Sequence, residues 1–365
     1  MTRALVFVWS HLGPDHADRA AAAARALGPA WRVVAAGLAA RTATYAWSPP
    51  EPGGGAVHTT LVPGRALHEV SRARRFAAVA RLLARERPAI AFLCHYERPE
   101  TWAAAWLARA LGARPVVMFD STRADAVRRP WREAGKRAAL WPYAGALASG
   151  ERALDYLATL GVPRARGVPG YDTLDTARVR ANAGGAVATP HSHRPFVLIA
   201  RLVAKKNIAG ALDAYTRYRT AMQAAGVPPR GLVLVGEGPA RPAYPPAGVT
   251  LTGALDPPAA HRWLGTALAL LLPSRSEQWG LVVNEALALG VPVLVSERAG
   301  AAELIAEGET GHRVPPDDTA ALVQHMARLT REPATWHRMA AAARSAAPLG
   351  DVRHFVNAVR AWLPQ

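Results

Sequence analysis

Short, strongly apolar runs alternate with helix-length segments through the first half of the chain. The apolar runs span residues 4–9, 31–36, 89–94, 115–119 and 145–149. Strands that are buried on both faces of a parallel sheet have this composition. Helical segments such as 101–111 lie between the runs, so we expect a βαβ-type domain built on a parallel sheet.

The alternation starts again in the second half, with apolar runs at 196–200, 232–235, 249–253, 268–272 and 292–296. After the first of these, an apolar stripe from Ile208 to Met222 predicts a helix that Gly226 stops. Asp256 before Pro257 predicts another helix start. Both halves are therefore predicted to be doubly wound, Rossmann-like α/β domains, which would face each other across a cleft at the carboxyl ends of their strands.

The length of 365 residues favours two domains. The alternation breaks at 181–195, where small residues, Gly and Pro predict a linker. We therefore expect an N-terminal domain at 1–180, a C-terminal domain at 196–348 and a last segment at 349–365. The predicted linker holds two histidines without further partners, which favours an exposed position over a metal site; these are His191 and His193.

The formal net charge of +17 would suit a nucleic-acid binder. However, only Lys136, Lys205 and Lys206 are lysines, so arginines make up the other 41 of the 44 basic residues, in a chain rich in alanine. This composition favours charge that is scattered over a solvated surface, and we expect no nucleic-acid partner. Attraction to phosphate, either on a nucleotide or on an anionic membrane, is the alternative.

Cys94 is the only cysteine, which excludes a disulfide within the chain and favours a reducing cytoplasm. Since no apolar run reaches the roughly 18 residues that a membrane helix needs, we expect no membrane span. Residues 71–87 form a basic amphipathic segment. This segment could lie on the inner face of a membrane, but packing of its apolar side on its own sheet is favoured. A peripheral membrane contact stays open.

The stretch SRSEQWGLVVNEALALG, residues 274–290, carries two acids around a predicted helix at 281–289. Glu277 lies in a loop at the carboxyl end of a strand, and Glu285 lies one turn into the helix. Gly280 would let a ligand approach the backbone, and the first amides of the helix would bind an anion. Two solvated acids are the alternative interpretation. The candidate ligands of this stretch are Glu277, Gly280, Leu281, Val282 and Glu285.

A second candidate cluster follows the apolar run at 196–200. Arg201 comes directly after this run and Lys206 five positions later, before a predicted helix. A planar guanidinium and an ammonium suit a diphosphate, although an ordinary basic loop explains them equally well. Gly236, in the sequence GEGP, predicts a tight turn at the same edge and is a further candidate ligand residue. No Walker A motif, dinucleotide fingerprint or Asp-x-Asp occurs, so no metal-held diphosphate is expected.

Three motifs, ARLVAKKN, LVLVGEGP and PSRSEQWGLVVNEALALGVPVLVS, occur in this order in the second half. Together they resemble the C-terminal half of the retaining GT-B glycosyltransferases of family 4. The resemblance implies that Arg201 and Lys206 hold the diphosphate of a nucleotide-sugar donor. It also implies that Glu277 touches the transferred sugar and that Glu285 hydrogen-bonds the ribose hydroxyls, since a carboxylate accepts two hydroxyl donors at once.

The N-terminal half resembles the same family less specifically. Residues 87–121 resemble a segment whose strand ends in a histidine, which implies a catalytic, acceptor-side role for His95. An ordinary packed side chain is the alternative for this histidine. Gly13 would belong to an acceptor-side loop, but its segment SHLGPDH lacks the paired glycines that are frequent in the family. The resemblance further implies that the helix at 349–365 packs back on the first domain.

The implied activity is the metal-independent transfer of a sugar from a nucleotide-diphosphate sugar to a hydroxyl or amine, with retention at the anomeric carbon. The donor is a co-substrate, and neither a cofactor nor a metal is expected. Arg201, Lys206 and the helix amides would stabilise the charge that develops on the leaving diphosphate. The acceptor, the donor sugar and the oligomeric state are left open. The alternative functions are a nucleotide-sugar epimerase of GT-B architecture and a basic module that binds nucleic acid or a phosphate surface.

Overall fold

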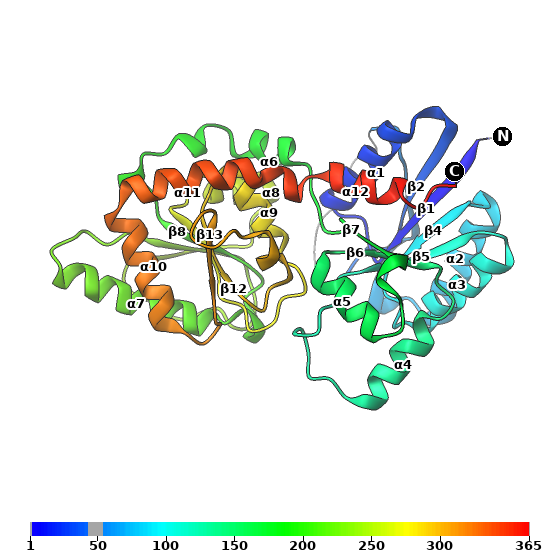
Figure 1. Cartoon of the computed structure of the whole chain (residues 1–365), viewed down its shortest axis with the longest axis horizontal. Helices are drawn as coiled ribbons and strands as arrows, with labels where there is room; N and C mark the ends of the chain where they lie inside the picture. The colour runs from blue at the N-terminus through cyan, green and yellow to red at the C-terminus, as the bar shows by residue number, and fades with distance from the viewer. Residues whose placement is uncertain (1, 43–53, 365) are drawn as a thin grey trace. The chain divides into compact units, whose positions relative to one another are not determined.

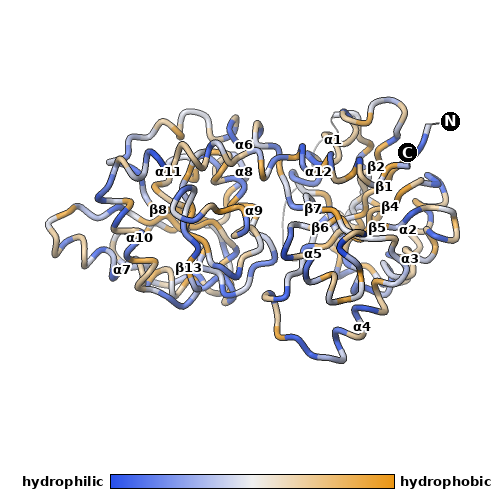
Figure 2. The backbone as a smooth tube through the Cα atoms, viewed as in Figure 1, coloured by the Kyte–Doolittle hydropathy of each residue, from blue (hydrophilic) through white to orange (hydrophobic). Residues whose placement is uncertain are grey.

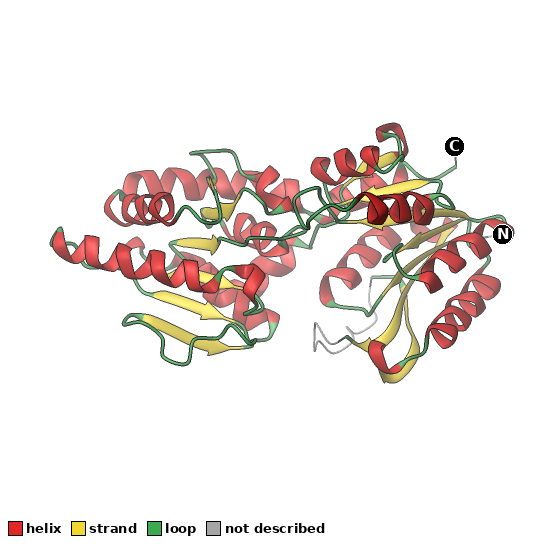
Figure 3. Cartoon of the chain, turned by 90° about the horizontal axis from the view of Figure 1, so that it is seen from below, coloured by secondary structure: helices red, strands yellow, loops and turns green. Residues whose placement is uncertain are grey.

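The computed structural model describes residues 2–42 and 54–364, and the chain divides into two compact units (Figure 1). Unit 1 comprises Met1–Arg123, Val127–Asp175 and Val352–Gln365. Unit 2 comprises Ala124–Ala126 and Thr176–Asp351. Each unit holds its own parallel sheet with helices packed against it (Figure 3).

Unit 1 contains a seven-stranded parallel sheet in the order β3-β2-β1-β4-β5-β6-β7. Its strands are β1 (Arg3–Trp9), β2 (Trp31–Arg41), β3 (Val57–Ala66), β4 (Ile90–Leu93), β5 (Arg114–Phe119), β6 (Gly145–Ala148) and β7 (Gly167–Pro169). Its helices are α1 (Pro14–Leu27), α2 (Arg72–Glu86), α3 (Pro99–Ala110), α4 (Pro130–Leu140), α5 (Glu151–Thr159) and α12 (Val352–Arg360). Alternate residues of β1 enter two different cores, with Val6 and Val8 in one and Leu5 and Phe7 in the other. Both faces of this sheet are therefore covered, as in a doubly wound fold.

Unit 2 contains a six-stranded parallel sheet in the order β10-β9-β8-β11-β12-β13. Its strands are β8 (Phe196–Ile199), β9 (Leu232–Val235), β10 (Val249–Gly253), β11 (Ala269–Leu272), β12 (Val293–Ser296) and β13 (Gly311–Val314). Its helices are α6 (Thr176–Ala183), α7 (Ile208–Ala224), α8 (Pro257–Gly265), α9 (Leu281–Leu289), α10 (Thr319–Arg331) and α11 (Pro333–Ala346). Hydrophobic residues gather along the central strands of each unit (Figure 2). The predicted pair of doubly wound α/β domains is confirmed.

Each apolar run that was predicted as a strand is a strand in the structure, and the helices expected after Gly280 and after Asp256 are α9 and α8. The Asp256 side chain caps α8 by accepting the amide of Ala259 over 2.8 Å. Three strands were not predicted: β3, β7 and β13. Each of the three lies at an edge of its sheet.

The segment 181–195, predicted as a linker, is folded into unit 2. The Arg194 guanidinium is buried and donates to the carbonyls of Gly265 and Ala267 over 2.9 and 3.0 Å. A Cβ added at Gly265 would lie 3.2 Å from the side chain of Ala186. The small residues that suggested a linker therefore serve close packing on α8, and the division between the units lies at 175/176 and 351/352.

The C-terminal helix α12 belongs to unit 1. Phe355, Val359 and Trp362 are buried in the same core as β1, and the rings of Phe7 and Phe355 lie 5.3 Å apart. The Trp362 ring also lies against Gly145, where an added Cβ would come within 2.4 Å of it. Unit 1 is therefore built from both the first and the last described residues of the chain.

The basic helix α2 packs its apolar side on unit 1. Val79, Leu82 and Leu83 are buried in the core, whereas Arg72 and Arg74 are exposed. The favoured interpretation of this segment is confirmed, because the side chains that could enter a membrane are covered by the protein itself. Within the described residues, none of the helices combines the length and the apolarity that crossing a lipid bilayer requires.

Candidate functional site

In the unit 2 sheet, β8 and β11 are neighbours although they are far apart in sequence. The strand order reverses between them, and in open α/β sheets ligands bind at the carboxyl ends of such strands. One of the two loops that follow carries Arg201 and Lys206, and the other carries Glu277. The loops are in contact, since the Arg275 amide donates to the Lys205 carbonyl over 2.8 Å. The structure thus brings the two predicted motifs together.

Lys206 and Glu277 form an ion pair between these loops. Their side chains are 13% and 11% exposed, and the Ser274 hydroxyl lies 3.4 Å from Oε2 of Glu277. Burial lowers the pKa of the Lys206 ammonium, and the Glu277 carboxylate opposes this shift only in part. Because a buried charge requires a partner, each group fixes the position of the other. The ammonium is thereby held at the edge where the sequence predicts a diphosphate.

Gly236 lies at the end of β9 with a φ of 136°. A Cβ added here would come within 1.9 Å of the Ala200 carbonyl oxygen, so the two strand ends approach too closely for another residue. The following turn is tied to the same loop, since the Leu202 amide donates to the Glu237 carbonyl over 2.8 Å. Gly236 therefore holds the Arg201 loop against β9, and its predicted contact with a donor stays a prediction.

Helix α9 begins directly after Gly280, which has a left-handed φ of 101°. The first backbone bond runs from the Val283 amide to the Gly280 carbonyl over 2.9 Å. The amides of Leu281 and Val282 precede this bond in the first turn, where backbone N–H groups generally have no partner within the helix. They follow Glu277 within a few residues, so the predicted anion site and the ion pair share one loop.

Glu285 lies in the second turn of α9, and its side chain is 18% exposed. Its Oε1 atom lies 3.4 Å from Nε2 of His261, a buried side chain on α8. The other ring nitrogen of His261 lies 3.0 Å from Nδ2 of Asn182 on α6. Neither His261 nor Asn182 was predicted for the site. No sequence motif marks them, because their connection to Glu285 depends on the packing of three helices.

In unit 1 the strand order reverses between β1 and β4. Gly13 follows β1 and caps α1, and His95 follows β4, so both predicted residues lie at the carboxyl edge of this sheet. His95 has a left-handed φ of 60°. Such a backbone is uncommon for a residue other than glycine and often marks a functional position. Its Nδ1 atom lies 3.2 Å from Oε1 of Glu97.

Two further histidines flank Gly13 and were not predicted. The Gly13 amide donates to Nδ1 of His16 over 3.1 Å, and the rings of His11 and His16 lie 5.8 Å apart. Burial, followed by the charge of Arg19, lowers the pKa of His16 well below its ordinary value, so the ring is neutral near pH 7. The sequence does contain a signal for these two histidines, since SHLGPDH places one on each side of Gly13.

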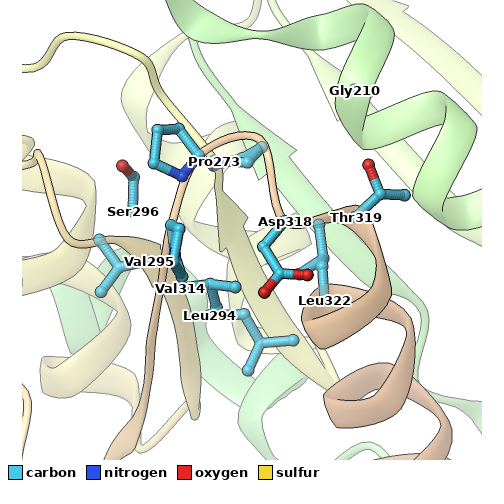
Figure 4. Close-up of a pocket in the computed structure, with 11 residues that line it drawn as sticks. Gly210, Pro273, Leu294, Val295, Ser296, Val314, Asp318, Thr319 and Leu322 are labelled. Carbon is cyan, nitrogen blue, oxygen red and sulfur yellow. The ribbon is translucent and has the colours of Figure 1, made fainter.

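A small pocket opens at the carboxyl ends of β12 and β13 in unit 2 (Figure 4). Apolar side chains such as Leu294 and Leu322 line it, with Asp318 and Thr319 at the start of α10. The Asp318 carboxylate caps that helix by accepting the Ala321 amide over 2.9 Å. None of the residues predicted for the donor lines this pocket, so it is distinct from the predicted site.

Among residues 2–42 and 54–364, no group of three or more His, Cys, Asp or Glu side chains is placed to hold a metal ion. One of the two histidines of the predicted linker, His191, instead packs within unit 2. Its Nε2 atom lies 2.9 Å from the Leu329 carbonyl, and its ring meets Trp336 edge-on at 5.5 Å. This histidine therefore has a structural role.

Part of the second half of the chain is similar to a known family. Residues 193–332 match the family model described as Glycosyl transferases group 1. Alpha-D-kanosaminyltransferase of Streptomyces kanamyceticus is 30% identical over 182 residues, which cover 45% of this chain and 43% of that protein. A D-inositol 3-phosphate glycosyltransferase of Frankia alni is 39% identical over 93 residues, which cover 24% of this chain and 23% of that protein. The chain thus spans less than half the length of these curated relatives.

Solved structures match the fold over nearly the whole chain. Sucrose-phosphate synthase of Thermosynechococcus elongatus gives a TM-score of 0.69 at 20% identity, with 98% of both chains covered. The HepE protein of Anabaena, solved in complex with UDP, gives a TM-score of 0.69 at 14% identity, again with 98% of both chains covered. Residues 193–332 therefore match the glycosyl transferases group 1, and the chain as a whole has the GT-B fold.

Proposed function

We propose that the protein is a retaining glycosyltransferase that moves a sugar from a nucleotide-diphosphate sugar to an acceptor hydroxyl or amine. The single observation that carries this proposal is the meeting of two loops in unit 2, where Lys206 pairs with Glu277 directly before α9. The group 1 family match covers these loops, and relatives named as glycosyltransferases are similar to part of the chain. The UDP complex of Anabaena HepE makes uridine nucleotides the first donors to test.

The diphosphate of the donor is proposed to lie at the start of α9. Arg201 and Lys206 supply positive charge there, and the amides of Leu281 and Val282 add the positive end of the helix dipole. These groups stabilise the negative charge that develops on the leaving diphosphate without a metal ion. Lys206 has a second task, because it also holds the carboxylate that is proposed to contact the transferred sugar, Glu277.

The ribose is proposed to lie beside Glu285, and the acceptor beside unit 1 residues. Glu285 accepts hydrogen bonds from the ribose hydroxyls, while Gly236, which has no Cβ, lets the Arg201 loop pack closely against β9. For the acceptor side, support comes from the position of Gly13 and His95 at the reversal of strand order and from the left-handed backbone of His95. His95→Ala is therefore expected to reduce sugar transfer and to leave nucleotide binding in unit 2 unchanged.

The decisive experiment identifies the donor and then the stereochemistry of transfer. UDP-, ADP- and GDP-sugars are screened by thermal shift, and the product made from the donor that binds is analysed by NMR. We expect the anomeric configuration of the donor to be retained. Glu285→Gln should weaken nucleotide binding about tenfold, since a charged acceptor is lost. Glu309→Gln, an exposed acid in unit 2, is the matched control.

Other outcomes of the same experiment would support the alternatives. An inverted product, or no binding of any nucleotide sugar, contradicts the proposed transferase. Epimerised donor in the absence of an acceptor indicates the epimerase. Salt-sensitive DNA binding that persists in Glu277→Ala indicates the basic binding module.

A peripheral contact with an anionic membrane is proposed for a surface other than α2. Trp102 and Trp106 on α3 and Trp141 after α4 are 41%, 37% and 78% exposed. The rings of Trp106 and Trp141 lie 5.9 Å apart, and the Arg109 guanidinium lies over the Trp106 ring at 5.9 Å. Tryptophan and arginine together suit the headgroup region of a bilayer. The cytoplasmic location stays a prediction.

A further inference from the structure

We propose that His261 is a positioning residue that sets the orientation of the Glu285 carboxylate and so contributes to recognition of the ribose hydroxyls. This inference rests on the proposed function, in which Glu285 accepts those hydroxyls. His261 lies on α8, is 2% exposed and lies outside the three motifs that carry the family resemblance. Its two ring nitrogens face side chains from two other helices, α6 and α9.

Asn182 selects the tautomer of His261. The Nδ2 atom of Asn182 lies 3.0 Å from Nδ1 of the imidazole. A carboxamide nitrogen only donates hydrogen bonds, so Nδ1 accepts and the neutral ring carries its proton on Nε2. The Nε2–H group then faces Oε1 of Glu285, 3.4 Å away. Donors and acceptors therefore alternate without conflict from Asn182 through His261 to Glu285.

The surroundings of His261 hold the imidazole in place before any ligand binds. Leu264 and Gly265, the next residues on the same side of α8, are buried. A Cβ added at Gly265 would lie 3.3 Å from the side chain of Ala183, the neighbour of Asn182 in the chain. The two helices that carry Asn182 and His261 are therefore closely packed, and the hydrogen-bond partners have little freedom to move.

A fixed imidazole lowers the cost of ordering Glu285. The glutamate is long and partly exposed, so without a partner a ligand would have to restrict its rotamers on binding. With Oε1 directed toward His261, the carboxylate plane is set, and Oε2 together with the second lone pair of Oε1 is directed to accept the ribose hydroxyls. His261 therefore acts on the ribose through Glu285 and does not contact the ligand itself.

The test compares ribonucleotides with their 2′-deoxy forms on the full chain. Titration calorimetry gives the Kd of UDP and of 2′-deoxy-UDP, with the ADP and GDP pairs run in parallel, and the pair whose ribonucleotide binds most tightly is used. The ratio of the two Kd values reports the contact with the 2′-hydroxyl. We expect a ratio of about ten for the wild type and about one for Glu285→Gln. His261→Ala should reduce the ratio to about two, chiefly by weakening the ribonucleotide.

Two conservative variants separate positioning from packing. The amide nitrogen of glutamine reaches about the place of imidazole Nε2, whereas that of asparagine reaches about the place of Nδ1. His261→Gln should therefore restore the Kd ratio and His261→Asn should not. Thermal unfolding is measured for each variant, because a purely structural role would lower the Tm of all of them and leave the ratio unchanged.

The outcomes distinguish this inference from the function on which it rests. A wild-type ratio near one, or an unchanged ratio in Glu285→Gln, contradicts the role of Glu285 itself. A second outcome is that the wild type and His261→Ala both prefer the ribonucleotide to its 2′-deoxy form equally strongly, while Glu285→Gln has lost this preference. That outcome overturns only the inference about His261. Should His261→Ala fail to fold, Asn182→Leu tests the same point: it removes the donor to Nδ1, and an undiminished ratio would again overturn the inference.

Discussion

Removing Lys206 should destabilise unit 2 more than removing its partner Glu277. Lys206→Met leaves a carboxylate that is 11% exposed and has the Ser274 hydroxyl 3.4 Å from its Oε2 atom. Loss of one partner of a buried ion pair costs about 3–5 kcal/mol, and the lower end, about 3 kcal/mol, applies to a pair that water partly reaches. For a unit of this size, about 3 kcal/mol lowers the Tm by roughly 6–12 °C.

Glu277→Gln should cost only about 1 kcal/mol, because the Lys206 ammonium can lose its proton once its partner is gone and so need not remain an unpaired buried charge. Burial already lowers the pKa of Lys206, so the folded chain binds this proton less tightly than the unfolded chain does. The stability of this variant should therefore rise as the pH increases from 7 to 9. The double variant should cost about 2 kcal/mol, well below the sum of the single costs, because no unpaired charge remains.

Urea unfolding and differential scanning calorimetry of the four proteins at pH 7 complete this double-mutant cycle. Arg275→Met is the matched control in the same loop. Its ion pair with Asp317 has an Nε to Oδ1 distance of 3.0 Å, but the side chains are 52% and 66% exposed. Loss of this exposed pair should cost less than about 1 kcal/mol. The reasoning would be refuted if the losses in free energy of unfolding of the two single variants added up to the loss of the double variant within about 0.5 kcal/mol.

Three further predictions concern other parts of the chain. Gly236→Ala should abolish soluble expression, because the added Cβ would lie 1.9 Å from a backbone carbonyl oxygen. Gly226→Ala, whose Cβ would have nothing within 4 Å, should lower the free energy of unfolding by only about 1 kcal/mol, and equal expression levels of the two variants would contradict this prediction. In urea unfolding, His16→Gln should lose less stability than the wild type between pH 7 and pH 5, because the wild-type ring has a lowered pKa and takes up its proton only on unfolding. The wild-type free energy of unfolding should fall by at most about 1.4 kcal/mol per pH unit from this source, and identical pH profiles of the two proteins would rule the prediction out. Replacing both Trp106 and Trp141 by alanine should reduce co-sedimentation with phosphatidylglycerol vesicles about fivefold or more, and a wild-type protein that stays in the supernatant would show that this surface binds no membrane.

The central strands could be predicted from the sequence and most edge strands could not, for a physical reason. A central strand of a parallel sheet is buried on both faces, which makes it a continuous apolar run such as β9 or β11. An edge strand tolerates polar residues, proline and glycine, and β3 contains Pro63 and Gly64 while β7 has only three residues. Sequences of this kind are indistinguishable from turns when the neighbouring strand is not known.

The candidate site likewise has a part that could be predicted from the sequence and a part that could not. The loop positions of Arg201, Glu277 and Gly280 follow from where strands and helices end, so they could be predicted. The pairing of Lys206 with Glu277 requires β8 and β11 to be neighbours, and the contact of His261 with Glu285 requires two helices to pack at one angle. Both are consequences of tertiary structure that no local pattern records.

The burial of α12 in unit 1 has a consequence for how the protein is made. Phe355 and Val359 complete the core that contains β1, yet a ribosome synthesises them after all of unit 2. Unit 2 is nearly continuous in sequence and has all its strands once residue 351 has emerged. Multidomain chains usually fold from the N-terminus onward during synthesis. In this chain, unit 2 can complete its core before unit 1 does, although most of unit 1 is translated earlier.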